Sequence, residues 1–158
     1  MTTITTGAIS ETEYVMSRVF NAPRDLVYRA NTDPDLIPRW WGQRATTTVV
    51  DRFDLQVGGG WRYIQKQDDG VEYAFRGEFL EIVPNEKLVM TFEFEPMPGH
   101  IVTDTHIFED VDGGTRLTTT STFATPEDLQ GMLQSGMEGG ANESWDQLAE
   151  LVAQLATA

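Results

Sequence analysis

The spacing of apolar positions changes from a two-residue repeat to a helical repeat near residue 124. Residues 12–20 and most of 45–123 alternate between apolar and polar side chains. The clearest run is 87–95, where one face carries only large apolar side chains, namely Leu88, Met90, Phe92 and Phe94. Such alternation is typical of half-buried strands, and the Gly-, Asp- and Asn-containing turns between the runs favour antiparallel pairing. The pattern therefore predicts one strand at 12–20 and six strands within 45–123.

Three other segments have helical spacing. A short helix follows Pro23, and a second one begins at Asp33 and is kept short by Pro38. Near the C-terminus, Thr125 is placed to cap a long helix that the apolar spacing carries to about Leu155. Because strands and helices are segregated along the chain, the predicted fold class is α+β, with the long C-terminal helix packed across an antiparallel sheet.

Composition narrows the class of protein more than its function. The chain has 158 residues, no cysteine and a formal net charge of −14. This length fits a single domain, 1–158, in which the Thr-rich residues 1–11 are expected to be a flexible tail. The lack of cysteine removes disulfides, thiolate catalysis and cysteine-ligated metals. The acidic charge disfavours nucleic acid and anionic membranes, and neither a signal peptide nor a membrane span is predicted. We expect a soluble, cytoplasmic protein.

The first half of the C-terminal helix is unusually rich in glycine. Four glycines fall there, at positions 131, 136, 139 and 140. Each interior glycine costs about 1 kcal/mol relative to alanine, so the group needs an explanation. One explanation is a frayed or kinked helix, or close packing of helix on sheet. The other is room for a ligand, because Gly136 and Gly140 share the predicted inward stripe with Leu133 and Met137, and flexible methionines such as Met132 can repack around different guests.

Alternation along the strands supplies the opposite wall of that predicted space. It combines large aromatic side chains with small hydroxyls, and ligand sites are mostly apolar with a few placed polar groups. The predicted cavity lining consists of Trp40, Trp41, Trp61, Tyr63, Met90, Phe92, Phe94, Leu117, Thr119, Ser121, Met132, Leu133, Gly136, Met137 and Gly140. The alternative is that most of these side chains are ordinary core. Because Trp40 and Trp41 are adjacent, we expect one to pack under the helix and the other to lie at the cavity mouth.

Few residues suggest chemistry in this space. His106 is a lone strand histidine that is either a satisfied polar residue or an acid–base group, and with His100 it makes no metal-ligand spacing. Arg18, Arg62 and Arg76 fall within predicted strands, and one that pointed inward would anchor a ligand carboxylate. Arg18 shares a strand face with Tyr14 and Phe20, and the alternative for it is a paired surface arginine. The glycine run at 58–60 precedes a strand rather than a helix, which argues against a nucleotide loop. No catalytic residue, metal or cofactor is predicted.

Several short motifs follow one another in a fixed order: Phe20-Asn21-Ala22-Pro23, Trp40-Trp41-Gly42, Val57-Gly58-Gly59, Glu81-Ile82-Val83-Pro84 with Lys87-Leu88, and Gly113-Gly114-Thr115. Over roughly residues 12–155, these motifs and the order of elements resemble the START-like superfamily, also called SRPBCC or polyketide cyclase/dehydrase-like. Within it, the chain resembles the subfamily of the activator of heat-shock protein 90 ATPase homologue. The resemblance implies a helix-grip fold: a curved antiparallel sheet of about six or seven strands, with a cavity between the sheet and the C-terminal helix. A shared fold transfers no particular reaction.

Three functions remain open. The first is binding of a small hydrophobic or aromatic molecule in the cavity, with no catalysis. The second is a cofactor-free enzyme of the cyclase, aromatase or hydratase type, which requires an ionisable side chain that points into the cavity. The third is a chaperone-associated or regulatory interaction module, which the subfamily's name suggests, although the eukaryotic co-chaperones of the family carry an additional domain.

Overall fold

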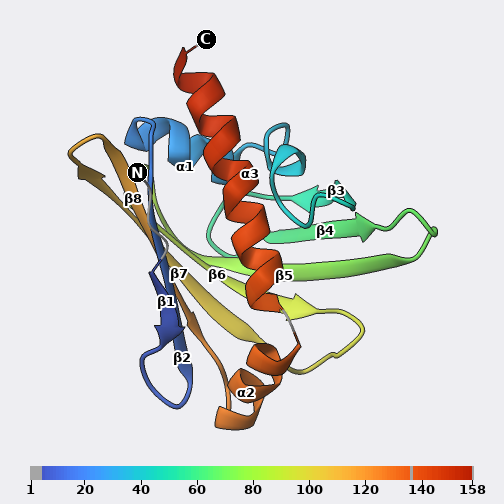
Figure 1. Ribbon diagram of the computed structural model, residues 1–158. Coiled ribbons are helices and arrows are strands. Elements are labelled where there is room, and N and C mark those ends of the chain that lie inside the picture. Colours follow the sequence, from blue (N-terminus) through green and yellow to red (C-terminus); the bar gives the residue numbers. More distant parts are fainter. Residues whose placement is uncertain (1–4, 136, 158) are drawn as a thin grey trace.

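The computed structural model describes residues 5–135 and 137–157 (Figure 1). Within these residues eight strands form one antiparallel sheet in the order β1-β2-β8-β7-β6-β5-β4-β3. The strands are β1 (Thr5–Ala8), β2 (Glu13–Phe20), β3 (Thr47–Phe53), β4 (Gly60–Lys66), β5 (Glu72–Val83), β6 (Lys87–Phe94), β7 (Val102–Val111) and β8 (Gly114–Thr122). The helical elements are α1 (Arg24–Thr32), the 3₁₀ turn η1 (Ile37–Arg39), α2 (Pro126–Gln134) and α3 (Met137–Thr157).

The α+β class and the helix that lies across an antiparallel sheet are confirmed. Figure 1 shows α3 running diagonally across one face of the sheet, with α1 towards its C-terminal end and α2 at its other end. Helix α3 contacts α1, α2, η1 and β2. We call the sheet face that α3 crosses the inner face. On the clearly alternating strands it carries the apolar side, for example Trp61 and Tyr63 on β4.

The sheet has more strands than the six or seven predicted. The additional strand is β1, which pairs in antiparallel register with β2, so that Thr5 lies opposite Ser17 and Ala8 opposite Tyr14. Its sequence lacks the alternation that marks a half-buried strand. Its place at the edge of the sheet explains this, because an edge strand gains its main-chain hydrogen bonds from one neighbour and needs no apolar face.

The prediction of one continuous C-terminal helix is wrong. The helical spacing divides into α2 and α3, and α2 ends at Ser135, whose backbone N–H and side-chain hydroxyl both donate to the Met132 carbonyl. A serine that bonds the last turn in this way competes with continued helix. The predicted start is confirmed, since the Thr125 side chain accepts a hydrogen bond of 3.1 Å from the Asp128 backbone N–H.

The second short helix is also smaller than predicted. It consists of a turn over 34–36 and one 3₁₀ turn, η1, rather than an α-helix. Asp33 does serve at its start, because its side chain accepts a hydrogen bond of 2.9 Å from the Asp35 backbone N–H. Pro38 lies within η1, where its missing N–H and fixed φ favour a short 3₁₀ turn over further α-helix.

The core is tightest at the end of the inner face that α1 and the second half of α3 cover. Phe20 and Trp145 meet edge to face there, with ring centroids 5.5 Å apart. Arg18 on β2 also points to α3 and pairs with Asp146 at 2.8 Å. The fully covered side chains at this end include Phe20, Val27, Leu117, Leu148 and Val152. This packing fixes the second half of α3 against the sheet.

Candidate functional site

The inner face changes character along individual strands. On β6, Leu88 is 1% exposed, whereas Met90, Phe92 and Phe94 on the same face remain half-buried. On β5, Phe79 is 0% exposed while Phe75 is half-buried. Large apolar side chains under a helix are ordinarily covered, as they are at the other end of this face. The face is therefore closed beneath the second half of α3 and incompletely covered towards α2.

A continuous group of aromatic rings lies in this part of the inner face. We call it the aromatic floor; its members are Trp41, Trp61, Tyr63, Phe75, Phe92 and Phe94. The rings of Trp41 and Phe75 meet edge to face at 5.1 Å, Phe75 stacks on Phe94 at 5.1 Å, and Phe75 lies 5.5 Å from Phe92. Trp61 lies 4.6 Å from Tyr63 and 6.1 Å from Phe92. These spacings are those of favourable aromatic pairs, so the floor is a single apolar surface over β4, β5 and β6.

A glycine lets the largest of these rings lie across the neighbouring strand. Gly77 on β5 pairs with Trp61 on β4, and a Cβ at Gly77 would lie 2.5 Å from the indole nitrogen. That nitrogen donates a hydrogen bond of 3.1 Å to the Thr91 carbonyl on β6. The indole of Trp61 therefore crosses β5 at the one position without a side chain. The close approach satisfies its polar atom inside the apolar surface.

The two adjacent tryptophans point to different places, one into the core and one towards the aromatic floor. Trp40 is 6% exposed and donates a hydrogen bond of 2.8 Å from its indole to the Ala30 carbonyl on α1. Trp41 is half-buried and joins the aromatic floor. The next residue, Gly42, ties this segment to α3, because its N–H donates to the Ser144 hydroxyl at 2.8 Å and its carbonyl accepts from Gln147 at 2.7 Å.

Beside the aromatic floor lies a polar group that we call the polar floor: Asp104 and His106 on β7, and Thr119 and Ser121 on β8. The strand register places His106 opposite Thr119 and Asp104 opposite Ser121. The Ser121 hydroxyl donates to Asp104 Oδ1 at 2.6 Å, and His106 Nδ1 lies 2.7 Å from the Thr119 hydroxyl. On the other side, β6 places Met90 opposite Asp104 and Phe92 opposite Val102. The two floors are therefore contiguous.

Burial perturbs both ionisable members of the polar floor. It raises the pKa of the Asp104 carboxyl to about 6, although the hydrogen bond from Ser121 opposes the rise. It lowers the pKa of the His106 imidazole to about 4. Both shifts disfavour the charged form, which is the signature of a weakly hydrated environment. Near neutral pH, His106 is uncharged and Asp104 is mostly ionised.

Each of these side chains has one polar atom that makes no hydrogen bond within the described part of the chain. Among the described residues, neither Asp104 Oδ2 nor His106 Nε2 has a hydrogen-bond partner. Both side chains are only half-buried despite lying on the face that the helices cover. Neither atom is among the fully buried side-chain atoms that lack a partner, so both keep access to solvent and are available to a polar group that is supplied from outside the chain.

Helix α2 and the start of α3 face this region. Leu129 is 1% exposed and anchors α2 to the core, whereas Met132 and Leu133 are half-buried and pack against it. A further tie holds α2 to the β6–β7 loop, since His100 Nδ1 lies 2.8 Å from Asp128 Oδ1. Fewer contacts therefore fix α2 than fix the second half of α3.

The predicted lining residues have different fates. Trp61, Tyr63, Leu117 and Thr119 are buried; Trp41, Met90, Phe92, Phe94, Ser121, Met132, Leu133 and Gly140 are half-buried; Trp40 is core. Gly136 and the side chain of Met137 lie outside the described part of the chain. Of the other glycines in this segment, Gly131 and Gly139 are exposed with no atom within 4 Å of an added Cβ, so they leave room towards solvent. Gly140 would approach Gln43 at 3.3 Å.

The sequence pattern missed two contributors to this surface. Phe75 belongs to the aromatic floor, and Asp104 to the polar floor. Along β7 the faces carry mixed residues, so alternation alone did not say that Val102, Asp104 and His106 point inward. The signal that finds them is the pairing of β7 with the strongly alternating β6, because residues opposite each other in a ladder share a face.

Arg18 does point inward, but it is engaged. Its guanidinium pairs with Asp146 on α3, and its side chain is 11% exposed. It also lies 5.5 Å from the centre of the Phe20 ring. The arginine thus bridges helix and sheet at the closed end of the inner face, and of the two alternatives its contacts support the paired arginine rather than the anchor for a ligand carboxylate.

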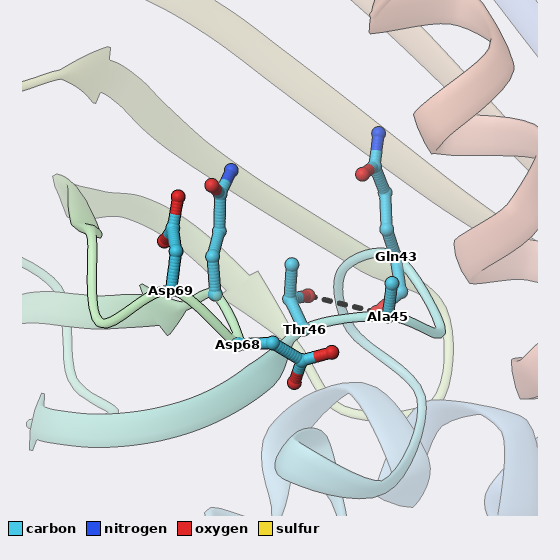
Figure 2. Close-up of a pocket in the computed structure, with 6 residues that line it drawn as sticks. Gln43, Ala45, Thr46, Asp68 and Asp69 are labelled. Carbon is cyan, nitrogen blue, oxygen red and sulfur yellow. Dashed lines mark hydrogen bonds between the residues drawn. The ribbon is translucent and has the colours of Figure 1, made fainter.

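A separate surface depression of about 280 Å³ lies between the segment after η1 and the β4–β5 hairpin (Figure 2). Its lining residues are Gln43, Ala45, Thr46, Gln67, Asp68 and Asp69. Four of them are exposed, and Asp69 Oδ1 is used inside the hairpin, where it accepts a hydrogen bond of 2.9 Å from the Val71 N–H. None of them belongs to either floor. The depression has the polar, open character of a turn surface rather than of a ligand site.

Within residues 5–135 and 137–157, no three histidine, aspartate or glutamate side chains come together in a way that would hold a metal ion. No helix within them is both long and apolar enough to cross a bilayer.

Comparisons with known proteins agree with this architecture. Residues 21–153 match the model of the family described as Activator of Hsp90 ATPase homolog 1-like protein. The fold is similar to a crystal structure from Rhodobacter sphaeroides (TM-score 0.90, 25% identity, 96% of this chain and 99% of that one). A protein from Mycobacterium smegmatis is also similar (TM-score 0.85, 26% identity, 95% and 97% covered). A solution structure from Arthrobacter aurescens shares the fold (TM-score 0.88, 23% identity, 96% and 91% covered).

The descriptions of these three structures state no ligand, reaction or partner. Comparison with the curated proteins gives no match. The family model spans most of the chain and covers α1, the sheet from β3 to β8, α2 and nearly all of α3. The chain belongs to the family of Activator of Hsp90 ATPase homolog 1-like proteins.

Proposed function

We propose that this protein binds a small apolar or aromatic molecule between the inner face of its sheet and helices α2 and α3. The observation that carries the proposal is the gradient of burial along β5 and β6. Phe79 and Leu88 are covered, while Phe75, Met90 and Phe92 on the same face remain half-buried. Exposed aromatic surface on a face that helices overlie costs free energy in water, about 25 cal/mol for each Å², and a bound apolar molecule removes that cost.

The contacts of helix α2 support the same proposal. Met132 is unbranched and adapts its shape to different neighbours, and α2 is tied to the sheet by few contacts. The closed end with Leu148 and Val152 keeps the fold stable without the guest. A protein built in this way admits a ligand at one end of the inner face without unfolding the other end.

The proposal is tested by NMR titration of the ¹⁵N-labelled protein with naphthalene and a panel of neutral aromatic and aliphatic molecules. Saturable shifts of the β5, β6 and α2 amides are expected. Met90→Trp should fill the space and weaken binding at least about tenfold, a loss of about 1.4 kcal/mol. The matched control is Val89→Trp, which adds the same side chain to the opposite face of β6 and should leave binding unchanged. A wild-type protein that responds to no member of the panel contradicts the proposal.

A second candidate is proton-transfer catalysis without a cofactor. The observation in its favour is that Asp104 and His106 face inward, which meets the requirement for ionisable groups beside the ligand space. Asp104 Oδ2 would take a proton from an O–H or acidic C–H of the bound molecule and return it to another atom of the same molecule, so that the product is an isomer. Conversion of a bound compound by the wild type, and its retention unchanged by Asp104→Asn, would separate this function from binding alone.

The family's description concerns activation of the Hsp90 ATPase, and a chaperone-directed role is the remaining alternative. No surface in the described part of the chain favours it over ligand binding. Stimulation of a purified Hsp90 ATPase by this protein, with no response to apolar molecules in the NMR titration, would reverse the order of the two proposals.

A further inference from the structure

We propose that the molecule bound on the inner face is amphipathic, with an aromatic or apolar body on the aromatic floor and a neutral hydrogen-bond donor, such as a hydroxyl or amide N–H, on Asp104, and that the same carboxylate excludes carboxylic acids. This inference rests on the proposed binding function and specifies its ligand class. Asp104 is thus assigned as the residue that determines specificity.

The first step is the position of the carboxylate. Asp104 lies opposite Met90 on β6. The neighbouring inward-facing residue on β7 is Val102, which lies opposite Phe92. Opposed residues in an antiparallel pair are about 5 Å apart between Cβ atoms. A ring that lies on Phe92 and Met90 therefore places a substituent on its rim within hydrogen-bonding reach of Asp104.

The second step is the state of the carboxylate. Its Oδ1 accepts the hydrogen bond from Ser121, and its Oδ2 has no partner among the described residues. Oδ2 is not among the fully buried atoms that lack a partner, so it reaches water in the free protein. A bare hydrocarbon that covers it would remove that water and leave the acceptor unpaired, at a cost of about 1–3 kcal/mol. A ligand that brings an O–H or N–H to Oδ2 avoids this cost.

The third step is the absence of a compensating cation. Within residues 5–135 and 137–157, no ion pair involves Asp104; its pKa responds to burial and to Ser121 alone. Arg18, which shares the inner face, is paired with Asp146. A ligand carboxylate would bring a second negative charge beside the first in a weakly hydrated space, and like charges there repel strongly. The neutral imidazole of His106 gives no positive charge to offset this repulsion.

The neighbouring polar atoms extend the recognition site. His106 Nε2 is unused, while its Nδ1 is held by the Thr119 hydroxyl, which fixes the orientation of the ring. A second polar atom of the ligand, two residues along the sheet from the first, would meet this imidazole. A neutral imidazole offers either a donor or an acceptor at Nε2. It therefore adds affinity for a ligand group that accepts or donates a hydrogen bond.

The test compares three ligands of the same size: naphthalene, 2-naphthol and 2-naphthoate, each titrated by NMR into the full-length protein. The wild type is expected to bind 2-naphthol at least about tenfold more tightly than naphthalene, since one charge-assisted hydrogen bond contributes about 1.4 kcal/mol or more. It should bind 2-naphthoate at least about tenfold more weakly than naphthalene. Asp104→Asn should reduce the preference for 2-naphthol and remove the discrimination against 2-naphthoate.

Two further variants keep the result interpretable. Ser121→Ala removes the hydroxyl but retains the carboxylate, so the discrimination against 2-naphthoate should persist. Asp112→Asn removes the charge of an exposed aspartate in the β7–β8 turn and should change no affinity. Equal affinity of the wild type for all three ligands, or unchanged rejection of 2-naphthoate by a folded Asp104→Asn protein, overturns this inference while the proposed function stands. Binding of none of the three ligands overturns this inference, and a lack of response to the whole panel of apolar molecules removes the proposed function as well.

Discussion

The polar floor gives a pH-dependent prediction that does not depend on any ligand. Asp104 and His106 lie two residues apart on β7, and burial perturbs their pKa values in opposite directions. In the native state Asp104 keeps its proton to a higher pH than in the unfolded chain. It therefore weakens stability as pH rises from about 4 to about 6. His106 remains neutral while the unfolded chain takes up a proton, so it adds stability as pH rises from about 4 to about 6.5.

The two contributions are of similar size. The pKa of Asp104 rises from 3.8 to about 6 and that of His106 falls from 6.5 to about 4. At 1.36 kcal/mol for each pKa unit, each group contributes about 3 kcal/mol over its full range. In the wild type they nearly cancel. Between about pH 5 and about pH 7.5, Asp104 lowers the free energy of unfolding by about 1.4 kcal/mol and His106 raises it by about 2 kcal/mol.

Removing either group should reveal the other. From about pH 5 to about pH 7.5, Asp104→Asn is expected to gain about 1.4 kcal/mol relative to the wild type, and His106→Gln to lose about 2 kcal/mol. Urea unfolding followed by tryptophan fluorescence at several pH values measures both slopes. Asp112→Asn is the matched control, because its side chain is exposed; its pH profile should run parallel to that of the wild type.

The opposite signs are the decisive feature. Contributions from other titrating groups are common to all the proteins and cancel in the comparison. They include Glu93, whose pKa is lowered by the hydrogen bond from the Gly99 backbone N–H and by Arg76, and Glu95, whose pKa is lowered by Arg62. Parallel pH profiles of the wild type, Asp104→Asn and His106→Gln would show that neither side chain is held in a weakly hydrated site. The argument for a polar floor beneath the helices would then fail.

Three further predictions concern the frame around the floors. Gly77→Ala should cost about 2–4 kcal/mol in urea unfolding because its Cβ would clash with the Thr91 carbonyl oxygen and with the Trp61 indole nitrogen. Gly131→Ala, with no atom within 4 Å of the added Cβ, should stabilise by up to about 1 kcal/mol; equal effects would refute the close approach at Gly77. Asp146→Asn should destabilise the folded protein by about 2 kcal/mol, because it weakens the pairing of a mostly buried Arg18. An unchanged urea midpoint would argue against this bridge between helix and sheet. His100→Ala should speed exchange of bound naphthalene in NMR line shapes because α2 loses a tie to the β6–β7 loop; an unchanged exchange rate would argue that α2 is not the moving element.

The sequence predicted the features that local periodicity controls. Alternation along 87–95 identified the inner face of β6, and the segregation of strands and helices gave the α+β class. The start of the last helix at Thr125 was correct because a cap involves only residues close in the chain. These features follow from the two-residue period of a strand and the 3.6-residue period of a helix, which each segment carries in its own sequence.

The tertiary structure decided everything that depends on which segments meet. Strand β1 exists because β2 offers a free edge, and the partial cover of Phe75 and Phe92 depends on where α2 lies. The inward position of Asp104 follows from its register with Met90, since the mixed alternation of β7 does not reveal it. Register and cover are set by contacts between residues distant in sequence, and a local pattern contains no information about them. For that reason the sequence could place the aromatic side of this surface, whereas the carboxylate beside it emerged only from the folded sheet.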